Sequence, residues 1–137
     1  MNNLIVRYPS PLLRLPCNDV FSNEMKGLRN KLMSVYDHKY MLGLAAPQIG
    51  INKKAFVAQG ILYINPRYEY RSNDVSDKRE ACLSLLEAHT VPRYNGITLT
   101  WFGGDNKERT QDFTGFTAEV IQHEMDHIAG KLILDYA

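Results

Sequence analysis

The sequence has few cysteines, almost no net charge and no long apolar run. Its two cysteines, Cys17 and Cys82, can form at most one disulfide bond, which excludes a disulfide-stabilised scaffold. In a reducing compartment, each is expected to be a metal ligand or a buried thiol. A net charge of +1 excludes the broad basic surface that binds a nucleic-acid backbone, so no nucleic-acid partner is expected.

A membrane-spanning or secreted protein is also not expected. The longest uncharged stretch, residues 40–52, is too short to cross a membrane and contains Pro47 and Gly50. Arg7, Pro9 and Pro11 interrupt any signal-peptide core at the start, so the cytoplasm is the expected location and no membrane contact is expected. A length of 137 residues, with 45% hydrophobic and 23% charged residues, predicts one globular domain over residues 1–137.

Hydrophobic spacing predicts two helices with short strands between them. The first helix is predicted from a Ser22 cap to about Tyr36, because apolar residues recur there at helical spacing. The second is predicted from a Thr114 cap to Gly130, a residue suited to the left-handed position after a helix. Strands are predicted at residues 54–58, 61–64, 68–72, 97–102 and 107–112.

The most informative segment is Gln-His-Glu-Met-Asp-His at residues 122–127, inside the second predicted helix. His123 and His127 lie four residues apart, so both imidazoles project from one helix face and can bind a single cation. Glu124 lies beside them as a potential base. After His127 the only carboxylate side chain is Asp135, so a third ligand is expected upstream.

The upstream candidates for the third ligand are Cys17, His38, Cys82 and His89. Cys82 is favoured because small residues near it let the backbone approach a ligand closely, whereas Cys17 lies in a proline-bounded loop. Lone histidines are more often surface residues than ligands. An inert buried thiol is the alternative for Cys82, and a charged amphipathic helix is the alternative for the histidine segment. One thiolate and two imidazoles suit zinc or ferrous iron and leave a fourth position for water.

A run of small and apolar residues from Leu42 to Gly50 contains a single polar side chain, Gln48. The run predicts close packing, as in a buried turn at the edge of a strand. A buried amide needs hydrogen-bond partners, and its NH₂ group can donate to an oxygen that develops negative charge. Gln48 is therefore a further candidate for the site.

Three segments together resemble the signature motifs of peptide deformylases, in that family's order. They are Gly-Leu-Ala-Ala-Pro-Gln-Ile-Gly at 43–50, Glu-Ala-Cys-Leu-Ser at 80–84 and Gln-His-Glu-Met-Asp-His at 122–127. The resemblance implies an α+β fold, with antiparallel strands packed around a central helix that bears the His-Glu-x-x-His motif. It also implies a metal-dependent hydrolase that removes formyl from the N-terminal formylmethionine of newly made polypeptides and releases formate.

The chain departs from the family pattern at several positions. Met41 and Ala81 stand where the family usually has glycine, and Leu86 replaces a common proline. Ala81 is expected to narrow the substrate groove slightly rather than to abolish activity. The sequence stops at Ala137, where many relatives continue into a C-terminal helix, so it resembles the short viral and phage forms.

The resemblance also implies roles for individual residues. The implied metal ligands are Cys82, His123 and His127. Ferrous iron is the implied metal, with zinc or another divalent transition metal also accepted by these ligands. Glu124 is the implied proton carrier, and the Gln48 side chain and the Leu83 backbone N–H are the implied oxyanion donors. The implied substrate-binding residues are Leu42, Gly43, Ala81 and Val120.

The implied partner is an N-formylmethionyl peptide, on nascent chains at the ribosome. The expected state is a monomer in the cytoplasm, or in the host cytoplasm for a viral protein. Glu80 is expected to orient a ligand histidine and Asp126 to pair with Arg93, with ordinary surface charges as the alternative. Glu119 is expected at the rim of the methionine pocket, where it would change side-chain preference.

Two other functions use the same residues. A metallopeptidase that cuts internal amide bonds shares the metal chemistry but needs a long open groove. A structural metal module needs a fourth protein ligand and gives Glu124 no reason to lie beside His123.

Overall fold

The computed structural model describes residues 4–136 of the chain. One sheet consists, in spatial order, of β1 (Gly43–Ala45), β2 (Ala55–Ala58), β3 (Ile61–Arg71), β6 (Gly96–Phe102) and β7 (Glu108–Thr114). A second sheet pairs β4 (Val75–Glu80) with β5 (His89–Tyr94). All of these strand pairs are antiparallel.

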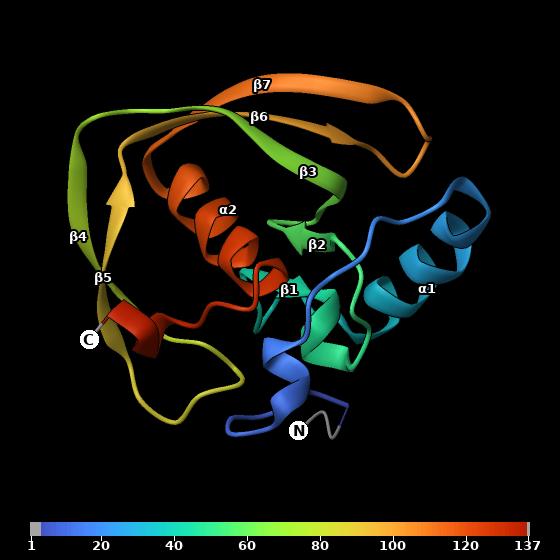
Figure 1. Ribbon diagram of the computed structural model, residues 1–137, viewed down its shortest axis with the longest axis horizontal. Coiled ribbons are helices and arrows are strands. Elements are labelled where there is room, and N and C mark those ends of the chain that lie inside the picture. The colour runs from blue at the N-terminus through green and yellow to red at the C-terminus, as the bar shows by residue number, and fades with distance from the viewer. Residues whose placement is uncertain (1–3, 137) are drawn as a thin grey trace.

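Helix α2 (Gly115–Ile128) lies in the hollow of the curved five-stranded sheet, with the β4–β5 pair at its side (Figure 1). It carries the His-Glu-x-x-His segment, so the architecture is the expected α+β arrangement. Side chains alternate along a strand, and in β6 the inward residues Ile97, Leu99 and Trp101 are buried against the helix. Val120 and Ile121 of α2 belong to the same core. This packing fixes the rotation of α2 about its axis.

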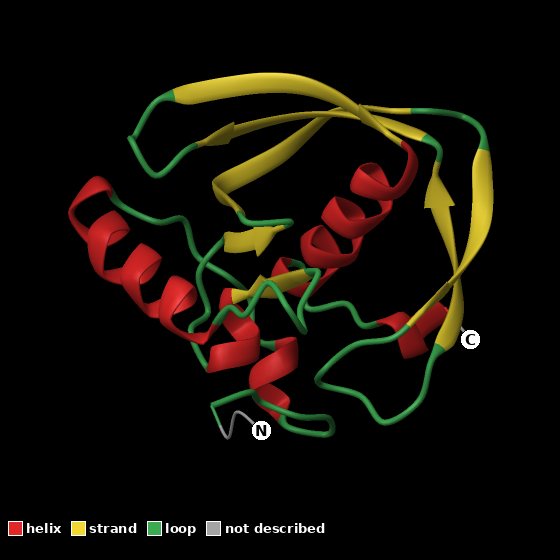
Figure 2. Cartoon of the chain, turned by 180° about the vertical axis from the view of Figure 1, so that it is seen from behind, coloured by secondary structure: helices red, strands yellow, loops and turns green. Residues whose placement is uncertain are grey.

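Helix α1 (Met25–Val35) packs elsewhere, apart from α2, as the view from behind shows (Figure 2). Its buried residues are the four that predicted it, Met25, Leu28, Leu32 and Val35. They share a second core with residues of β1 and β2, including Leu44 and Val57. Strands β1 and β2 therefore have a core on each face, which holds them rigidly beside α2.

The predicted start of α1 is wrong. Ser22 does not cap the helix, because it lies inside a short 3-10 helix, Ser22–Glu24. The Glu24 carboxylate instead accepts a hydrogen bond of 2.9 Å from the Phe21 backbone N–H. At the other end of the chain, Thr114 precedes α2 as predicted, although its side chain makes no capping hydrogen bond. Gly130 follows α2 with a φ of 74°, in the predicted left-handed conformation.

The predicted strands are only partly confirmed. The segments at 61–64 and 68–72 form one strand, β3, because Asn65 interrupts the ladder as an irregularity rather than ending it. Asn65 has a φ of 49°. Its Oδ1 accepts a hydrogen bond from the Val20 N–H, and its Nδ2 donates one to the Val20 carbonyl. Strands β4 and β5 were not predicted, since β4 is almost entirely polar and only Glu80 in it is buried.

Among residues 4–136, no helix is long and apolar enough to span a membrane.

Candidate metal centre

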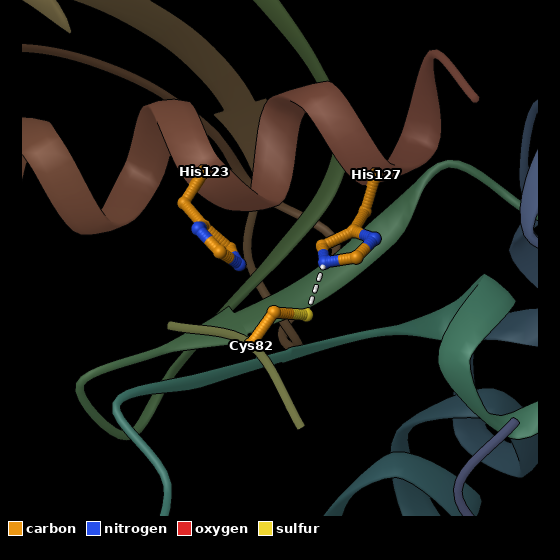
Figure 3. Close-up of side chains that lie close together, drawn as sticks. All are labelled: Cys82, His123 and His127. Atoms are coloured by element: carbon orange, nitrogen blue, oxygen red, sulfur yellow. Dashed lines mark hydrogen bonds between the residues drawn. The ribbon is translucent and has the colours of Figure 1, made fainter. Parts of the chain in front are cut away.

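Helix α2 and the loop after β4 bring Cys82, His123 and His127 together (Figure 3). The two imidazoles project from the same face of α2, with ring centroids 5.1 Å apart. Cys82 approaches them from the loop that follows β4, and its Sγ lies 3.3 Å from His127 Nε2. One ligand atom from each of the three residues lies within 4.8 Å of the other two.

This donor set fits a transition-metal ion. Ligand bonds of about 2.0 to 2.3 Å in a tetrahedron place the donor atoms about 3.3 to 3.6 Å apart. The 3.3 Å between Cys82 and His127 matches that spacing. Neither Cys17 nor the other two histidines, His38 and His89, joins this group within the described part of the chain. The structure thus has a Cys-His-His metal-binding group, with the sulfur from the middle of the chain.

The orientation of His123 is set by Glu80, the last residue of β4. Glu80 Oε1 lies 2.8 Å from His123 Nδ1. A carboxylate accepts, so Nδ1 carries the proton and Nε2 is left as the ligand atom. Glu80 itself is held by Arg93 of β5, whose Nε and Nη2 donate at 2.8 and 2.7 Å. Burial alone would raise the pKa of Glu80, but the hydrogen bonds from Arg93 and His123 outweigh it and lower the pKa to about 2.

Arg93 also donates from Nη1 to Asp126 Oδ2 at 2.6 Å. Both predicted contacts, Glu80 with a ligand histidine and Asp126 with Arg93, are therefore confirmed. The alternative of ordinary surface charges is wrong, since Arg93 is 3% exposed and Glu80 is 7% exposed. A buried ion pair needs such dense hydrogen bonding to offset the cost of desolvation.

Glu124 is buried next to the metal ligands, at the point where β1 meets α2. Its Oε1 has no hydrogen-bond partner among the described residues. Burial raises the pKa of Glu124 to about 7, although the charges of His123 and Arg93 offset part of that effect. Gly43 of β1 lies against this carboxylate, and a Cβ on Gly43 would come within 2.5 Å of Glu124 Oε2. Glycine at this position therefore leaves room for the glutamate.

Gln48 is 2% exposed and lies in the 3-10 helix Ala46–Ile49, which follows β1. Its Oε1 accepts a hydrogen bond of 2.9 Å from the Ala45 N–H, which fixes the orientation of the amide. Its Nε2 lies 3.2 Å from Ser84 Oγ and 3.6 Å from Cys82 Sγ. The two donor hydrogens of Gln48 are thus directed toward the loop that carries the cysteine.

A pocket of about 360 Å³ opens beside this group. The four residues predicted to bind substrate, Leu42, Gly43, Ala81 and Val120, all line it, as do Gln48, Leu83 and Glu124. Leu42 is 58% exposed and marks the mouth of the pocket. The wall also contains Glu119, at the predicted place. Tyr40 and Arg79 line the pocket and were not predicted, although each lies within three residues of a recognised motif.

Leu83 is positioned by the N-terminal segment. The Arg7 guanidinium donates to the Leu83 carbonyl at 2.7 Å, and the Tyr8 N–H donates to the Ser84 carbonyl at 2.8 Å. Ser84 Oγ in turn donates to the Val6 carbonyl at 2.6 Å. The loop that contains Cys82 is therefore tied to a segment far from it in sequence.

Comparison with known proteins finds matches in sequence and in fold over nearly the whole chain. The family model of polypeptide deformylases matches residues 3–137. A peptide deformylase of Borreliella burgdorferi is 30% identical over 141 residues, which cover 96% of this chain and 86% of that protein. The solved structure of a probable peptide deformylase from Synechococcus phage S-SSM7 has a TM-score of 0.90 at 31% identity, covering 97% of this chain and 98% of the phage chain.

A Met-Ala-Ser-bound peptide deformylase of Acinetobacter baumannii has the same fold, with a TM-score of 0.90 at 22% identity, covering 97% of this chain and 96% of that one. The family model matches almost the whole chain, and the Borreliella protein is 30% identical over 96% of it. A shared fold alone does not give a sequence match of this extent. The chain belongs to the peptide deformylase family.

Proposed function

We propose that residues 1–137 form a single catalytic domain that hydrolyses the N-terminal formyl group of formylmethionyl peptides and releases formate. The observation that carries this proposal is the position of the buried Glu124 carboxylate, whose Oε1 has no hydrogen-bond partner among the described residues, next to the Cys82, His123 and His127 group. Metal ligands with an open position beside a proton carrier are the arrangement that hydrolytic metal enzymes use. The family match supports the same reaction.

Cys82, His123 and His127 would hold the metal. We propose ferrous iron as the native ion, and zinc or another divalent transition metal would also suit one thiolate and two imidazoles. When bound, the ion would supply Lewis acidity, which lowers the pKa of a water molecule at that position to about 7. Glu80 and Arg93 keep the His123 ring in its ligand orientation through the contacts described above.

Glu124 would accept the proton of the attacking water and pass it to the departing amine nitrogen. A pKa of about 7 suits this role, because the carboxyl group can both accept and donate a proton near neutral pH. Such proton transfer contributes about 10² to 10⁴ in rate. Burial keeps bulk water away from the carboxylate, so the proton is exchanged with the substrate rather than with solvent.

Gln48 Nε2 and the Leu83 backbone N–H would stabilise the oxyanion. The fixed amide of Gln48 supports this role, because its orientation is set before substrate binds and need not change during the reaction. Losing one such donor costs about 3 kcal/mol in transition-state stabilisation. The contact from Arg7 to the Leu83 carbonyl supports a similar rigidity on the other side of the site.

The methionine side chain would enter the pocket between Leu42 and Val120, and the main chains of Gly43 and Ala81 would hold the peptide extended. In A. baumannii, a related enzyme carries a bound Met-Ala-Ser tripeptide. We propose nascent chains at the ribosome as the source of substrate, in the cytoplasm, with the enzyme acting as a monomer that binds neither nucleic acid nor a membrane.

The test combines two substrates with one substitution. Wild-type protein, purified without oxygen, should release formate from formyl-Met-Ala-Ser and should not cut a blocked internal peptide. Glu124→Gln should keep the metal and lose about 10² to 10⁴ in kcat. The matched control, Glu108→Gln on the exposed face of β7, should behave as wild type.

Each rival function predicts a different result. Cleavage of the internal peptide alone would indicate a metallopeptidase of other specificity. A metal-loaded protein without turnover, in which Glu124→Gln changes nothing, would indicate a structural module.

A further inference from the structure

Tyr136 connects the C-terminal turn of the described chain to the metal centre. It ends the 3-10 helix Ile133–Tyr136, which lies against β5 (Figure 1). Its hydroxyl donates a hydrogen bond of 2.7 Å to Asp126 Oδ2. Asp126 is on α2, in the same turn as the ligand His127 and three residues from the ligand His123. Tyr136 is therefore separated from the metal ligands by only a few contacts.

These contacts form one continuous path. Asp126 Oδ2 accepts from Arg93 at 2.6 Å as well as from Tyr136, so the two donors share one oxygen. Arg93 then grips both oxygens of Glu80, at 2.8 and 2.7 Å, and Glu80 Oε1 lies 2.8 Å from His123 Nδ1. The path runs through side chains of the C-terminal turn, α2, β5 and β4.

The aromatic ring of Tyr136 also lies close to two cationic side chains, one of them a member of the path. The Arg93 guanidinium lies 5.5 Å from the ring centroid, and Lys131 Nζ lies 4.1 Å from it. The Asp126 side chain is 19% exposed, so water reaches it more easily than Arg93, Glu80 or His123. A hydroxyl bound to that carboxylate occupies a position that water would otherwise take.

We propose that Tyr136 is a positioning residue for the metal ligand His123, acting through Asp126, Arg93 and Glu80. Arg93 is shared between two carboxylates, so its position depends on how firmly each of them is held. Without the Tyr136 hydroxyl, Asp126 rotates toward water and Arg93 follows it, which loosens its two bonds to Glu80. Glu80 then holds the imidazole less firmly. This inference rests on the proposed metal centre and adds a residue that none of the three sequence motifs contains.

The test measures how fast the metal leaves the protein. Direct partners of metal-binding histidines change metal affinity by about 10-fold to 100-fold when removed. Tyr136 acts three steps beyond Glu80, the direct partner of His123, so Tyr136→Phe should have a smaller effect and speed zinc release to an excess of chelator by about threefold to tenfold. Phenylalanine keeps the ring over Arg93, so thermal stability of the metal-free protein should change little. With the metal-loaded enzyme, kcat should fall while KM stays the same.

Asp135→Asn is the matched control, because Asp135 anchors the same C-terminal turn without joining the path. Its carboxylate accepts from Arg14 at 2.8 Å and from the Leu132 N–H at 2.8 Å. Asp135→Asn should therefore loosen the turn but keep the Tyr136 hydroxyl, so it should accelerate zinc release less than Tyr136→Phe does.

Two results would overturn the inference. Either Tyr136→Phe releases zinc at the wild-type rate, or Asp135→Asn accelerates release as much as Tyr136→Phe does, which would make Tyr136 an ordinary anchor of the turn. If the wild-type protein bound no metal at all, the proposed function would fail together with this inference. If the wild-type protein bound metal and released formate normally while Tyr136→Phe released zinc at the wild-type rate, only the role of Tyr136 would fail.

Discussion

Replacing Gly43 with alanine should disable the enzyme by displacing Glu124. The added Cβ would lie 2.5 Å from Glu124 Oε2 and 2.9 Å from the Val57 carbonyl oxygen. Non-bonded heavy atoms rest about 3.5 Å apart, so the first contact is about 1 Å too short. Strand β1 cannot move away to relieve this contact, because Gly43 is paired with Ala58 of β2, the strand that also contains Val57. The buried carboxylate must move, and the remaining contact with the Val57 carbonyl strains the β1–β2 pairing.

The expected magnitudes follow from this geometry. Overpacking a buried site costs about 1 to 3 kcal/mol, so urea unfolding should show a loss of stability in that range. Moving the Glu124 carboxylate out of its place should lower kcat for formate release by about 10² to 10⁴. Metal content should stay at the wild-type level, since the three atoms nearest the new methyl group belong to Glu124 and Val57 and not to a metal ligand. A Gly43→Ala enzyme with normal metal content and wild-type kcat would refute the reasoning.

Two further variants separate crowding from a general effect of alanine. Gly27 lies in α1 with no heavy atom near a Cβ built on it, so Gly27→Ala should gain about 0.5 to 1 kcal/mol of stability and keep wild-type kcat. Combining Gly43→Ala with Glu124→Ala removes the closest clash. The stability losses of these two substitutions should therefore be less than additive, as contacting residues in a double-mutant cycle commonly are. Full additivity would show that Gly43 and Glu124 do not interact.

Three other predictions concern the metal, the C-terminal turn and the pocket. Cys82→Ser should lower both metal content and formate release by more than about 100-fold, and metal analysis at wild-type level would contradict this. Hydrogen bonding to Arg14 lowers the pKa of Asp135 below its ordinary value of 3.8. The ionised Asp135 carboxylate therefore stabilises the folded protein above pH 3.8, and this contribution is lost as pH falls through the pKa of the folded state. Asp135→Asn should thus lower Tm at neutral pH, and this loss should shrink as pH falls below 3.8; a loss that does not change with pH would contradict it. Glu119→Leu should raise kcat/KM for formyl-Met-Ala-Ser by about tenfold, because an apolar wall suits a thioether better than a carboxylate does; an unchanged kcat/KM would contradict it.

Local sequence patterns predicted the parts of the fold that depend on local contacts. The apolar residues of α1 were predicted because a helix that buries one face repeats its pattern every three to four residues. The alternation in β6 predicted that strand in the same way. Strand β4 has no such pattern, since its side chains are mostly polar and its partner β5 supplies the hydrogen bonds. A polar strand that is stabilised by its neighbour cannot be recognised from its own residues.

The sequence by itself determined that two imidazoles lie on one helix face, because a spacing of four residues in an α-helix leaves no other arrangement. It favoured Cys82 over Cys17 through its motif, but helix geometry did not determine which sulfur joins the two imidazoles. Only the tertiary structure brings Cys82 within 3.3 Å of His127, and only it places Gly43 against Glu124 and Tyr136 on Asp126. Those contacts join residues far apart in the chain, so they depend on how the curved sheet, α2 and the β4–β5 pair pack together, which no local pattern encodes.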